Sequence, residues 1–470
     1  MEAFRMPSQE WLRKRAESDG QKIFEKIAQE ITNPIKRNEC CLVLDFGKKV
    51  YNFLSVFVVF LSRREETINF NVRPFMFMPT FEQKTTERIV EYIVEGGERM
   101  GLTREDVLKM SVVGDGAANI RKLGDYFKSY TLCSCHSLQK AAERVLDPLE
   151  ECLINFSSTE ISHLEEVNSL VDECSDLATT LRRNRIHHKL PKLPVAYCQT
   201  RWMTFVNCCQ DIIDLFPQIE MIDNARVDRL REKIRPKLPQ LITAVQILKL
   251  FEIPLKIFEK TEMRIHEVGP WLFKLQKTFQ DKHEQGKKFH NYTLEVVAKS
   301  AKVSIDHYIK KTISPPHLLA SILCPGMRNL SWFPPDYKKM ALELIERGIQ
   351  NIDVDEPDLT NNENDDPARE LYDEPPPTPT CHLELQDYRT SVFTPLDTSI
   401  PPIQFWNKHK NRFPRLSKLA ARVYCLVASE SICERSFSAL NRIFRNDRQC
   451  LDPELVEILM VSFLYLNSMK

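Results

Sequence analysis

Two aspartates, Asp45 and Asp115, have the side chains and the setting for divalent-cation chemistry. Asp45 lies in the apolar strand predicted at Cys41–Phe46, and Asp115 ends the strand predicted at Met110–Asp115. Carboxylate oxygens are the ligands that Mg²⁺ and Mn²⁺ prefer, and two such ions about 3.5–4 Å apart can activate a water or a 3′-hydroxyl against a phosphodiester. Alternatively, Asp115 only caps the helix that is predicted to begin after Gly116.

The segments around these aspartates alternate in the order β-β-β-α-β-α-β-α. Pro74 indicates an edge strand or a strand end in the third segment. In a mixed sheet of this order, as in the RNase H-like fold, the first and fourth strands are neighbours, which would bring Asp45 and Asp115 together. Strands are predicted at Cys41–Phe46, Phe53–Leu61, Thr67–Phe77, Met110–Asp115 and Tyr130–Cys135, and helices at Thr85–Met100 and Ala117–Phe127.

The composition and the predicted secondary structure change twice in the remainder of the chain. Amphipathic helices predominate to about Gly348, an acidic and proline-rich stretch follows, and the end of the chain is apolar and helical again. We therefore expect an α/β core with added α-helical parts. The predicted organisation is a helical lead-in at 1–39, a first part of the core at 40–145, a helical insertion domain at 146–350, a disordered linker at 351–400 and a helical C-terminal region at 401–470.

The charge is neutral in total but unevenly distributed. The chain has 65 basic and 65 acidic residues, and ten of the acids lie between Asn351 and Thr380 with one base, so the remainder carries a formal excess of nine positive charges. This excess is consistent with phosphate contacts. The 14 cysteines include the neighbours Cys40 and Cys41, which favour reduced thiols over a disulfide framework. No leader is recognised and no apolar run reaches the length of a membrane span, so we expect a soluble intracellular protein.

The C-terminal segment Phe405–Ser468 resembles the dimerisation region of hAT-family transposases. It has a W…N…FP.LS.LA opening, the core SESICERSFS, an R..L.PE arm and a final helix ending in LYLN. Further landmarks follow the family's order: RMPSQEWL, VVGDGAANI, CSCH, TRW and LLASILCPGMRNLSWF. The resemblance spans the chain and implies an RNase H-like core split by a helical insertion, cut-and-paste DNA transposition with hairpin formation, and a nuclear protein.

The resemblance also implies a DDE triad of Asp45, Asp115 and Glu434, which would hold Mg²⁺ or Mn²⁺. Glu434 is the acid of CERSFS, on a predicted helix where Phe437 and Leu440 can pack while the acid faces the sheet. The alternative for Glu434 is an exposed helical acid paired with an arginine.

DNA contacts are implied for another four residues. Trp202 of the TRW motif would stack on an extruded base and Arg201 would contact phosphate, whereas the alternative for Trp202 is a buried core position. Cys133 and His136 match the family's C-x-x-H motif, but two ligands are too few for a structural zinc site, so we expect them to pack. The basic connector Leu181–Pro194 fits a DNA backbone or an ordinary loop.

Three departures bear on activity. Asp45 is followed by Phe46, Gly47, Lys48 and Lys49 rather than by the family's D-x-W-[ST] pattern. The stretch ASES stands where the family commonly has a proline before the core of the C-terminal motif. No C-x-x-C…H-x-H finger precedes Asp45. The hypotheses are therefore a self-associating, DNA-binding hAT-like protein, an active two-metal nuclease or strand transferase, and a transposon fragment without a role. The final helix is apolar nearly all round, which by itself indicates a homodimer or higher oligomer formed through residues 405–470.

Overall fold

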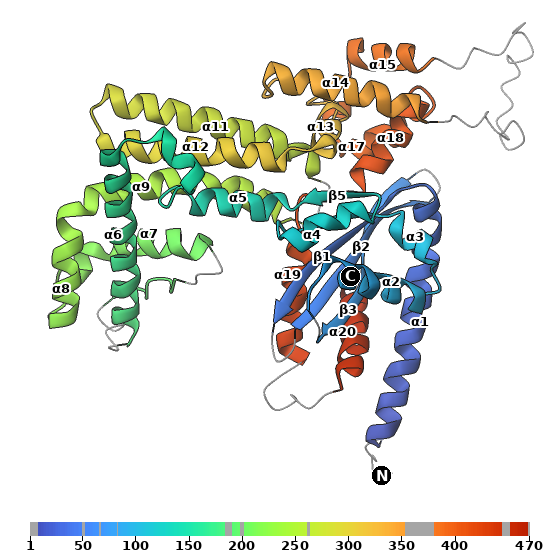
Figure 1. Ribbon diagram of the computed structural model, residues 1–470, viewed down its shortest axis with the longest axis horizontal. Helices are drawn as coiled ribbons and strands as arrows, with labels where there is room; N and C mark the ends of the chain where they lie inside the picture. The colour runs from blue at the N-terminus through green and yellow to red at the C-terminus, as the bar shows by residue number, and fades with distance from the viewer. Residues whose placement is uncertain are drawn as a thin grey trace, which may run out of the picture. The chain divides into compact units, whose positions relative to one another are not determined.

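The computed structural model describes residues 8–48, 52–64, 67–81, 83–183, 190–197, 202–260, 264–352, 380–443 and 452–468. They form two compact units (Figure 1). The first takes its residues from Met1–Leu132, Thr261–Pro270 and Ser314–Lys470, and the second from Cys133–Lys260 and Trp271–Ile313. No helix in the described ranges combines the length and the apolar character needed to cross a bilayer.

The first unit is built on one mixed five-stranded sheet of order β3-β2-β1-β4-β5. β1, β2 and β3 are antiparallel, and β4 and β5 run parallel to β1. The prediction that the first and fourth strands are neighbours is thus confirmed. The strands are β1 (Cys40–Lys48), β2 (Asn52–Arg64), β3 (Thr67–Thr80), β4 (Ser111–Gly114) and β5 (Ser129–Leu132).

Alternation along β1 sends its side chains to opposite faces of the sheet. Leu42 and Leu44 lie in a continuous hydrophobic core, together with residues of α1 (Gln9–Lys36), α2 (Thr86–Arg99) and α20 (Pro453–Ser468). These helices therefore cover one face of the sheet (Figure 1). Val43 and Asp45 point to the other face, so β1 carries apolar packing on one side and the candidate chemistry on the other.

Local sequence explains where the helices near the sheet begin. Ser8 accepts a hydrogen bond from the Trp11 amide at 3.2 Å before α1, and Thr85 accepts one from the Arg88 amide at 3.3 Å before α2. Thr103 forms a capping box at the start of α3. The remaining short helices here are α3 (Arg104–Leu108), α4 (Ala118–Arg121) and the 3-10 helix Lys122–Asp125. The single helix predicted at Ala117–Phe127 is therefore two short helical segments.

Pro74 lies inside β3 rather than at its end. β3 is the edge strand of the sheet, and the pairing register shifts between Val56 and Phe57, where Phe57 faces Pro74. An edge position and a bulge both tolerate the missing amide hydrogen of proline. The prediction of an edge strand is confirmed.

The rest of the first unit is helical and has an aromatic core. Trp406 is completely buried and donates its indole hydrogen to the Leu323 carbonyl at 2.8 Å. The buried Tyr388 donates to the Ile322 carbonyl at 3.0 Å, and its ring lies 4.9 Å from that of Trp406. The helices are α13 (Pro315–Ile322), α14 (Pro335–Gln350), α15 (Cys381–Thr390), α16 (Pro395–Ser399), α17 (Pro402–Lys408), α18 (Pro414–Tyr424) and α19 (Ser431–Ile443).

Helices α15 and α16 lie within the range where the sequence predicts a linker. Burial of Leu385 and Tyr388 explains why this part is ordered, since both side chains join the packed interior. Residues 353–379, which contain the acidic run, are outside the described residues. The described part of the range predicted as a linker therefore contains two helices, Cys381–Thr390 and Pro395–Ser399.

The described residues of the second unit form helices joined by loops and contain no strand. Ser300 and Ser304 of α12 donate to the carbonyls of Val145 and Ala141, each at 2.6 Å, and so join α12 to α5 and the residues that follow it. The helices are α5 (Ser134–Glu143), α6 (Ser158–Arg183), α7 (Trp202–Ile219), α8 (Ala225–Ile234), α9 (Leu238–Leu248), α10 (Glu252–Phe258), α11 (Ile265–Lys288) and α12 (Tyr292–Thr312), with 3-10 helices at Glu150–Asn155, Arg235–Lys237 and Lys249–Phe251.

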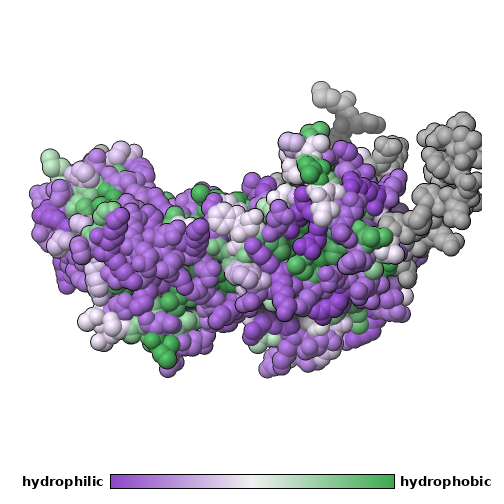
Figure 2. Space-filling view, turned by 90° about the horizontal axis from the view of Figure 1, so that it is seen from above, coloured by the Kyte–Doolittle hydropathy of each residue, from purple (hydrophilic) through white to green (hydrophobic). Residues whose placement is uncertain are grey.

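Every cysteine in the described residues is a free thiol, which agrees with the expectation of reduced cysteines. Most are buried, including the neighbours Cys40 and Cys41. The face of the molecule in Figure 2 is largely hydrophilic and carries several separate hydrophobic patches.

Candidate carboxylate site

Asp45 lies on β1 with its side chain half-buried. Its Oδ1 accepts a hydrogen bond from the Phe46 amide at 2.7 Å. Ser55 is its partner on the antiparallel β2, and the Ser55 side chain is completely buried. The strand pair therefore holds the Asp45 carboxylate at a defined position on the face away from Leu42 and Leu44.

Asp115 follows β4 directly and stands beside Asp45. The parallel register of β1 and β4 pairs Leu42 with Val112 and Val43 with Val113. Each aspartate is two residues beyond the second pair, so both point to the same face at the same level of two adjacent strands, which lie about 4.8 Å apart in sheets.

Local hydrogen bonds hold the end of β4. The Oδ1 atom of Asp115 accepts from the Ala117 amide at 3.0 Å. The hydroxyl of Tyr130 donates to the carbonyl of Gly114 at 3.2 Å and also to that of Asp115. The bond from the Ala117 amide agrees in part with the capping alternative for Asp115, because one oxygen of Asp115 stabilises the turn before α4. A carboxylate has several lone pairs, so this bond leaves acceptor capacity for a cation.

Glu434 is exposed in the first turn of α19, and three contacts attach this helix to the same face of the sheet. The Cys433 thiol donates to the Val43 carbonyl at 3.4 Å. The hydroxyls of Ser436 and Ser55 are 2.9 Å apart. Both contacts involve residues one or two positions from Glu434, so they place the turn that carries this acid against the strands that carry Asp45.

The third contact needs a glycine in β1. A Cβ atom built on Gly47 would lie 2.4 Å from the ring of Phe437, far inside van der Waals contact. Gly47, which departs from the family's usual residues after the first aspartate, therefore has a packing role here. It lets α19 approach β1 closely.

The electrostatics indicate that the carboxylates share one environment. The pKa of Asp45 is raised to about 7, first by burial and then by the negative charge of Glu430, with further increases from Glu434 and Asp115. The hydrogen bond from the Phe46 amide acts in the opposite direction. Glu434 and Asp115, two of the acids predicted from sequence, therefore act on the third, Asp45.

Glu430 was not predicted. It precedes α19 and is completely buried, and its charge is the largest electrostatic contribution to the raised pKa of Asp45. The available signal in the sequence was a single acid inside the otherwise apolar and small-residue run from Val423 to Cys433. The charge of Glu430 therefore joins those of Glu434 and Asp115 in acting on Asp45.

A lysine from another element also acts on this cluster. Lys84 lies just before α2, and its Nζ is 4.2 Å from the centre of the Phe46 ring. Burial lowers its pKa, while the charges of Asp45 and Asp115 oppose that change. The sequence predicted cations beside the site at Lys48 and Lys49. Lys48 is exposed and contributes to the lowered pKa of Lys84, whereas Lys49 is outside the described residues.

The donor set suits a hard divalent cation. The side chains of Asp45, Asp115 and Glu434 offer only oxygen ligands. The charges of Glu434 and Asp115 add to the effects of burial and of Glu430 in raising the pKa of Asp45, and a bound cation would oppose all of these charges. The ammonium group of Lys84 would oppose such an ion at long range. The carboxylate oxygens of Asp45, Asp115 and Glu434 do not all lie within 4.8 Å of one another, so Mg²⁺ or Mn²⁺ binding by these acids stays a prediction.

The predicted DNA-contact residues belong to other segments. Arg201 is outside the described residues, and of Trp202 only the backbone, which begins α7, is described. Cys133 is the N-cap of α5, where its sulfur accepts from the His136 amide at 3.4 Å. Cys133 is buried and His136 half-buried, so the first has the structural role that the sequence favoured. Cys133, His136 and Trp202 lie within the range of the second unit.

The basic connector is described only at its ends. Lys192 forms an ion pair with Asp211 of α7, and the Asp211 carboxylate also accepts from the Val195 amide at 2.8 Å. Arg182 donates to the Pro194 carbonyl at 2.9 Å. These cations stabilise the connector itself, which agrees with the reading of an ordinary loop at its ends. Residues 184–189 are outside the described ranges.

Comparison with known proteins places this architecture in a family. Residues 384–466 match the hAT family C-terminal dimerisation region, which takes in α17, α18, α19 and nearly all of α20. Residues 26–115 match a domain of unknown function, DUF8247, which extends from α1 to Asp115. The first match supports a hAT-family protein and self-association.

A relative extends the similarity to the whole chain. The Caenorhabditis elegans protein named "Uncharacterized protein ZK1098.2" is 30% identical over 497 aligned positions, which cover 98% of this chain and 74% of the worm protein. The chain therefore belongs to the same family as this nematode protein.

Proposed function

We propose that this protein is a hAT transposase-like protein that self-associates through its C-terminal region, engages DNA in the nucleus and holds a divalent cation between Asp45, Asp115 and Glu434. The sheet order and the later return of α19 to the sheet support an RNase H-like core. The proposal rests on one observation. Asp45 and Asp115 each lie two residues beyond the register pair Val43 and Val113, and the helical turn that carries Glu434 contacts the same strand β1.

Self-association is supported by one face of α20. Val456, Met460 and Tyr465 are buried against the core of the first unit. A second row of apolar residues, which we call the α20 stripe, recurs every three or four positions and is half-buried or exposed: Leu455, Leu459, Phe463 and Leu466. Residues at this spacing share one helix face, and such a row suits a contact with a second copy.

The double substitution Leu459→Asp and Phe463→Asp tests this role. Charges on the α20 stripe would have to be desolvated in a dimer, so we expect the variant to run as a monomer in light scattering while the unchanged protein is at least a dimer. Leu396→Asp is the matched control, since Leu396 is an exposed apolar residue of α16 outside the stripe. Equal masses for the stripe variant and the unchanged protein would exclude the stripe as the interface.

Catalysis is the second candidate function. Two cations on these carboxylates would activate a nucleophile and stabilise a leaving oxygen at a phosphodiester. The chain itself would orient the acids. The backbone amides of Phe46 and Ala117 donate to Asp45 and Asp115, and α19 contacts β1 through the hydrogen bond from Cys433 to the Val43 carbonyl. Lys84, close to both aspartates, would contact a phosphate or weaken cation binding.

Plasmid nicking in Mg²⁺ or Mn²⁺ separates the two functions. An active enzyme cleaves DNA with the metal, and loses at least a hundredfold in rate on Asp115→Asn while keeping the activity on Asp125→Asn. Asp125 is an exposed acid of the neighbouring 3-10 helix and serves as the control. Absence of cleavage in the unchanged protein leaves the first function, a self-associating DNA-engaging protein. DNA binding is then measured by fluorescence anisotropy at rising salt, where a phosphate-dependent complex weakens.

A further inference from the structure

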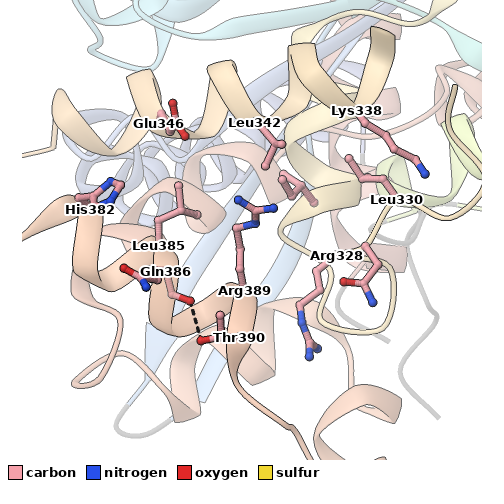
Figure 3. Close-up of a pocket in the computed structure, with 12 residues that line it drawn as sticks. Arg328, Leu330, Lys338, Leu342, Glu346, His382, Leu385, Gln386, Arg389 and Thr390 are labelled. Carbon is pink, nitrogen blue, oxygen red and sulfur yellow. Dashed lines mark hydrogen bonds between the residues drawn. The ribbon is translucent and has the colours of Figure 1, made fainter. Parts of the chain in front are cut away.

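A polar cavity lies in the first unit, among helices that do not contribute to the carboxylate site. It has a volume of about 590 Å³ and is lined by α14, α15 and the turn after α13 (Figure 3). This volume falls within the range of small-molecule sites, which is about 300–1,000 Å³. All of its lining residues belong to the described part of the first unit.

Cations reach the cavity from three separate elements. Lys338 comes from α14, Arg389 from α15 and Arg328 from the turn after α13. Figure 3 shows Arg389 extending from α15 toward α14, with Lys338 farther along α14. One carboxylate, the exposed Glu346, also lines the cavity, so cations outnumber acids there.

The three cations differ in how they are held. Arg328 donates to the carbonyls of Pro325 at 3.0 Å and Ser391 at 2.6 Å, and its guanidinium lies 4.8 Å from the centre of the Phe393 ring. It is a fixed positive charge. Lys338 and Arg389 form no ion pair with any residue in the described part of the chain. Their donors are therefore available to a ligand.

The remaining walls combine apolar surface with hydrogen-bonding groups. Leu330 and Leu385 are buried side chains of the lining, while Asn329 and Gln386 offer amide groups. The hydroxyl of Thr390 is occupied by the Gln386 carbonyl at 2.9 Å (Figure 3). Guanidinium and ammonium groups match phosphate oxygens, and the leucines match the less polar body of an ester.

We propose that this cavity binds a nucleotide-sized organic phosphate, with the phosphate held by Arg389 and Lys338 and the body of the ligand against the leucines. Arg328, held by the carbonyls of Pro325 and Ser391, adds a positive charge to the lining. The ligand is either a free nucleotide or one nucleotide unit of a strand, since both present the same chemistry. This site is independent of the carboxylate site and of the function proposed for it.

Isothermal titration of the full chain with AMP, adenosine and the single strand dA8 tests the proposal. We expect saturable binding of AMP and at least tenfold weaker binding of adenosine, which lacks the phosphate. Similar affinities for dA8 and AMP assign the site to a free nucleotide, and dA8 binding at least tenfold tighter assigns it to a strand. Either result supports the site. Absence of saturable AMP binding, or equal binding of adenosine, would overturn it.

Paired variants establish where the ligand binds. Lys338→Gln with Arg389→Gln removes the two available cations and should weaken AMP binding at least tenfold. Lys339→Gln with Arg347→Gln removes the same charge from exposed positions of α14 outside the cavity and should leave AMP binding unchanged. Thermal unfolding of both variants verifies the fold. Equal AMP affinity in the two variants would contradict the assignment.

Discussion

Asp45 and Asp115 occupy equivalent positions on neighbouring parallel strands, each two residues beyond the paired Val43 and Val113. The relationship joins two residues far apart in sequence at one level of the sheet. Because adjacent parallel strands are about 4.8 Å apart, two acids at one level repel each other unless a proton or a cation lies between them. The pKa of Asp45 is raised to about 7 first by burial and then by the charge of Glu430, and the charge of Asp115 adds a smaller increase.

The substitution Asp45→Asn should make stability less dependent on pH. Folding raises the Asp45 pKa from 3.8 to about 7, so the folded state binds the proton more tightly than the unfolded state. This contribution is fully present below about pH 4 and is lost as pH rises through about 7. At pH 8 without divalent cations, Asp45→Asn should therefore raise the free energy of unfolding by roughly 2 kcal/mol, after allowance for a half-exposed group.

Urea unfolding at pH 4.5 and pH 8 measures this effect. The gain from Asp45→Asn should be small at pH 4.5 and larger at pH 8, and the control Asp125→Asn should show no such trend. A gain at pH 4.5 that equals the gain at pH 8 would show that Asp45 does not have the raised pKa.

Lys84→Gln should strengthen cation binding at the carboxylates. The charges of Asp45 and Asp115 act on Lys84, so its removal takes a competing positive charge from the neighbourhood of the acids. A charge at this range is worth about 1 kcal/mol, which corresponds to roughly a fivefold gain in Mn²⁺ affinity. Calorimetry measures the affinity, with Lys122→Gln as an exposed-lysine control. An unchanged or lower Mn²⁺ affinity in Lys84→Gln would refute this role.

Gly47→Ala should detach α19 from β1. The new Cβ atom would meet the Phe437 ring at 2.4 Å, and overpacking of this kind costs about 1–3 kcal/mol of unfolding free energy. Adding Phe437→Leu should return part of that loss, because the smaller side chain leaves room for the methyl group. Gly326→Ala is the control, since its Cβ atom would make only an ordinary 3.5 Å contact with Thr398. Urea midpoints for the four proteins decide the matter, and equal midpoints for both alanine variants would show that no clash exists.

Much of the sheet follows from local sequence pattern. β1, β2 and β3 are recognisable because their apolar and β-branched runs are long, and the short β4 is bounded by Met110 and Asp115. The acids at the ends of β1 and β4 were found for the same reason. The pairing of β1 with β4 cannot be recognised from either segment alone. It was predicted from the order of strands and helices along the chain.

The missed features depend on tertiary contacts. Glu430, just before α19, is completely buried in the folded chain, and Lys84, just before α2, lies beside Phe46 and is acted on by the charges of Asp45 and Asp115. Neither relationship has a periodic signal in the sequence. Helix α15 was assigned to a linker because its few apolar residues, Leu385 and Tyr388 among them, gain their burial from α13 and α17.

Mn²⁺ binding by electron paramagnetic resonance tests the central claim most directly, since it reports free and bound ion without requiring catalysis. At pH 8 the unchanged protein should bind Mn²⁺ saturably, and Asp115→Asn should lower the affinity at least tenfold while Asp125→Asn leaves it unchanged. Mg²⁺ should compete for the same site. Absence of saturable Mn²⁺ binding, or equal affinity in Asp115→Asn and Asp125→Asn, would contradict a cation site formed by Asp45, Asp115 and Glu434.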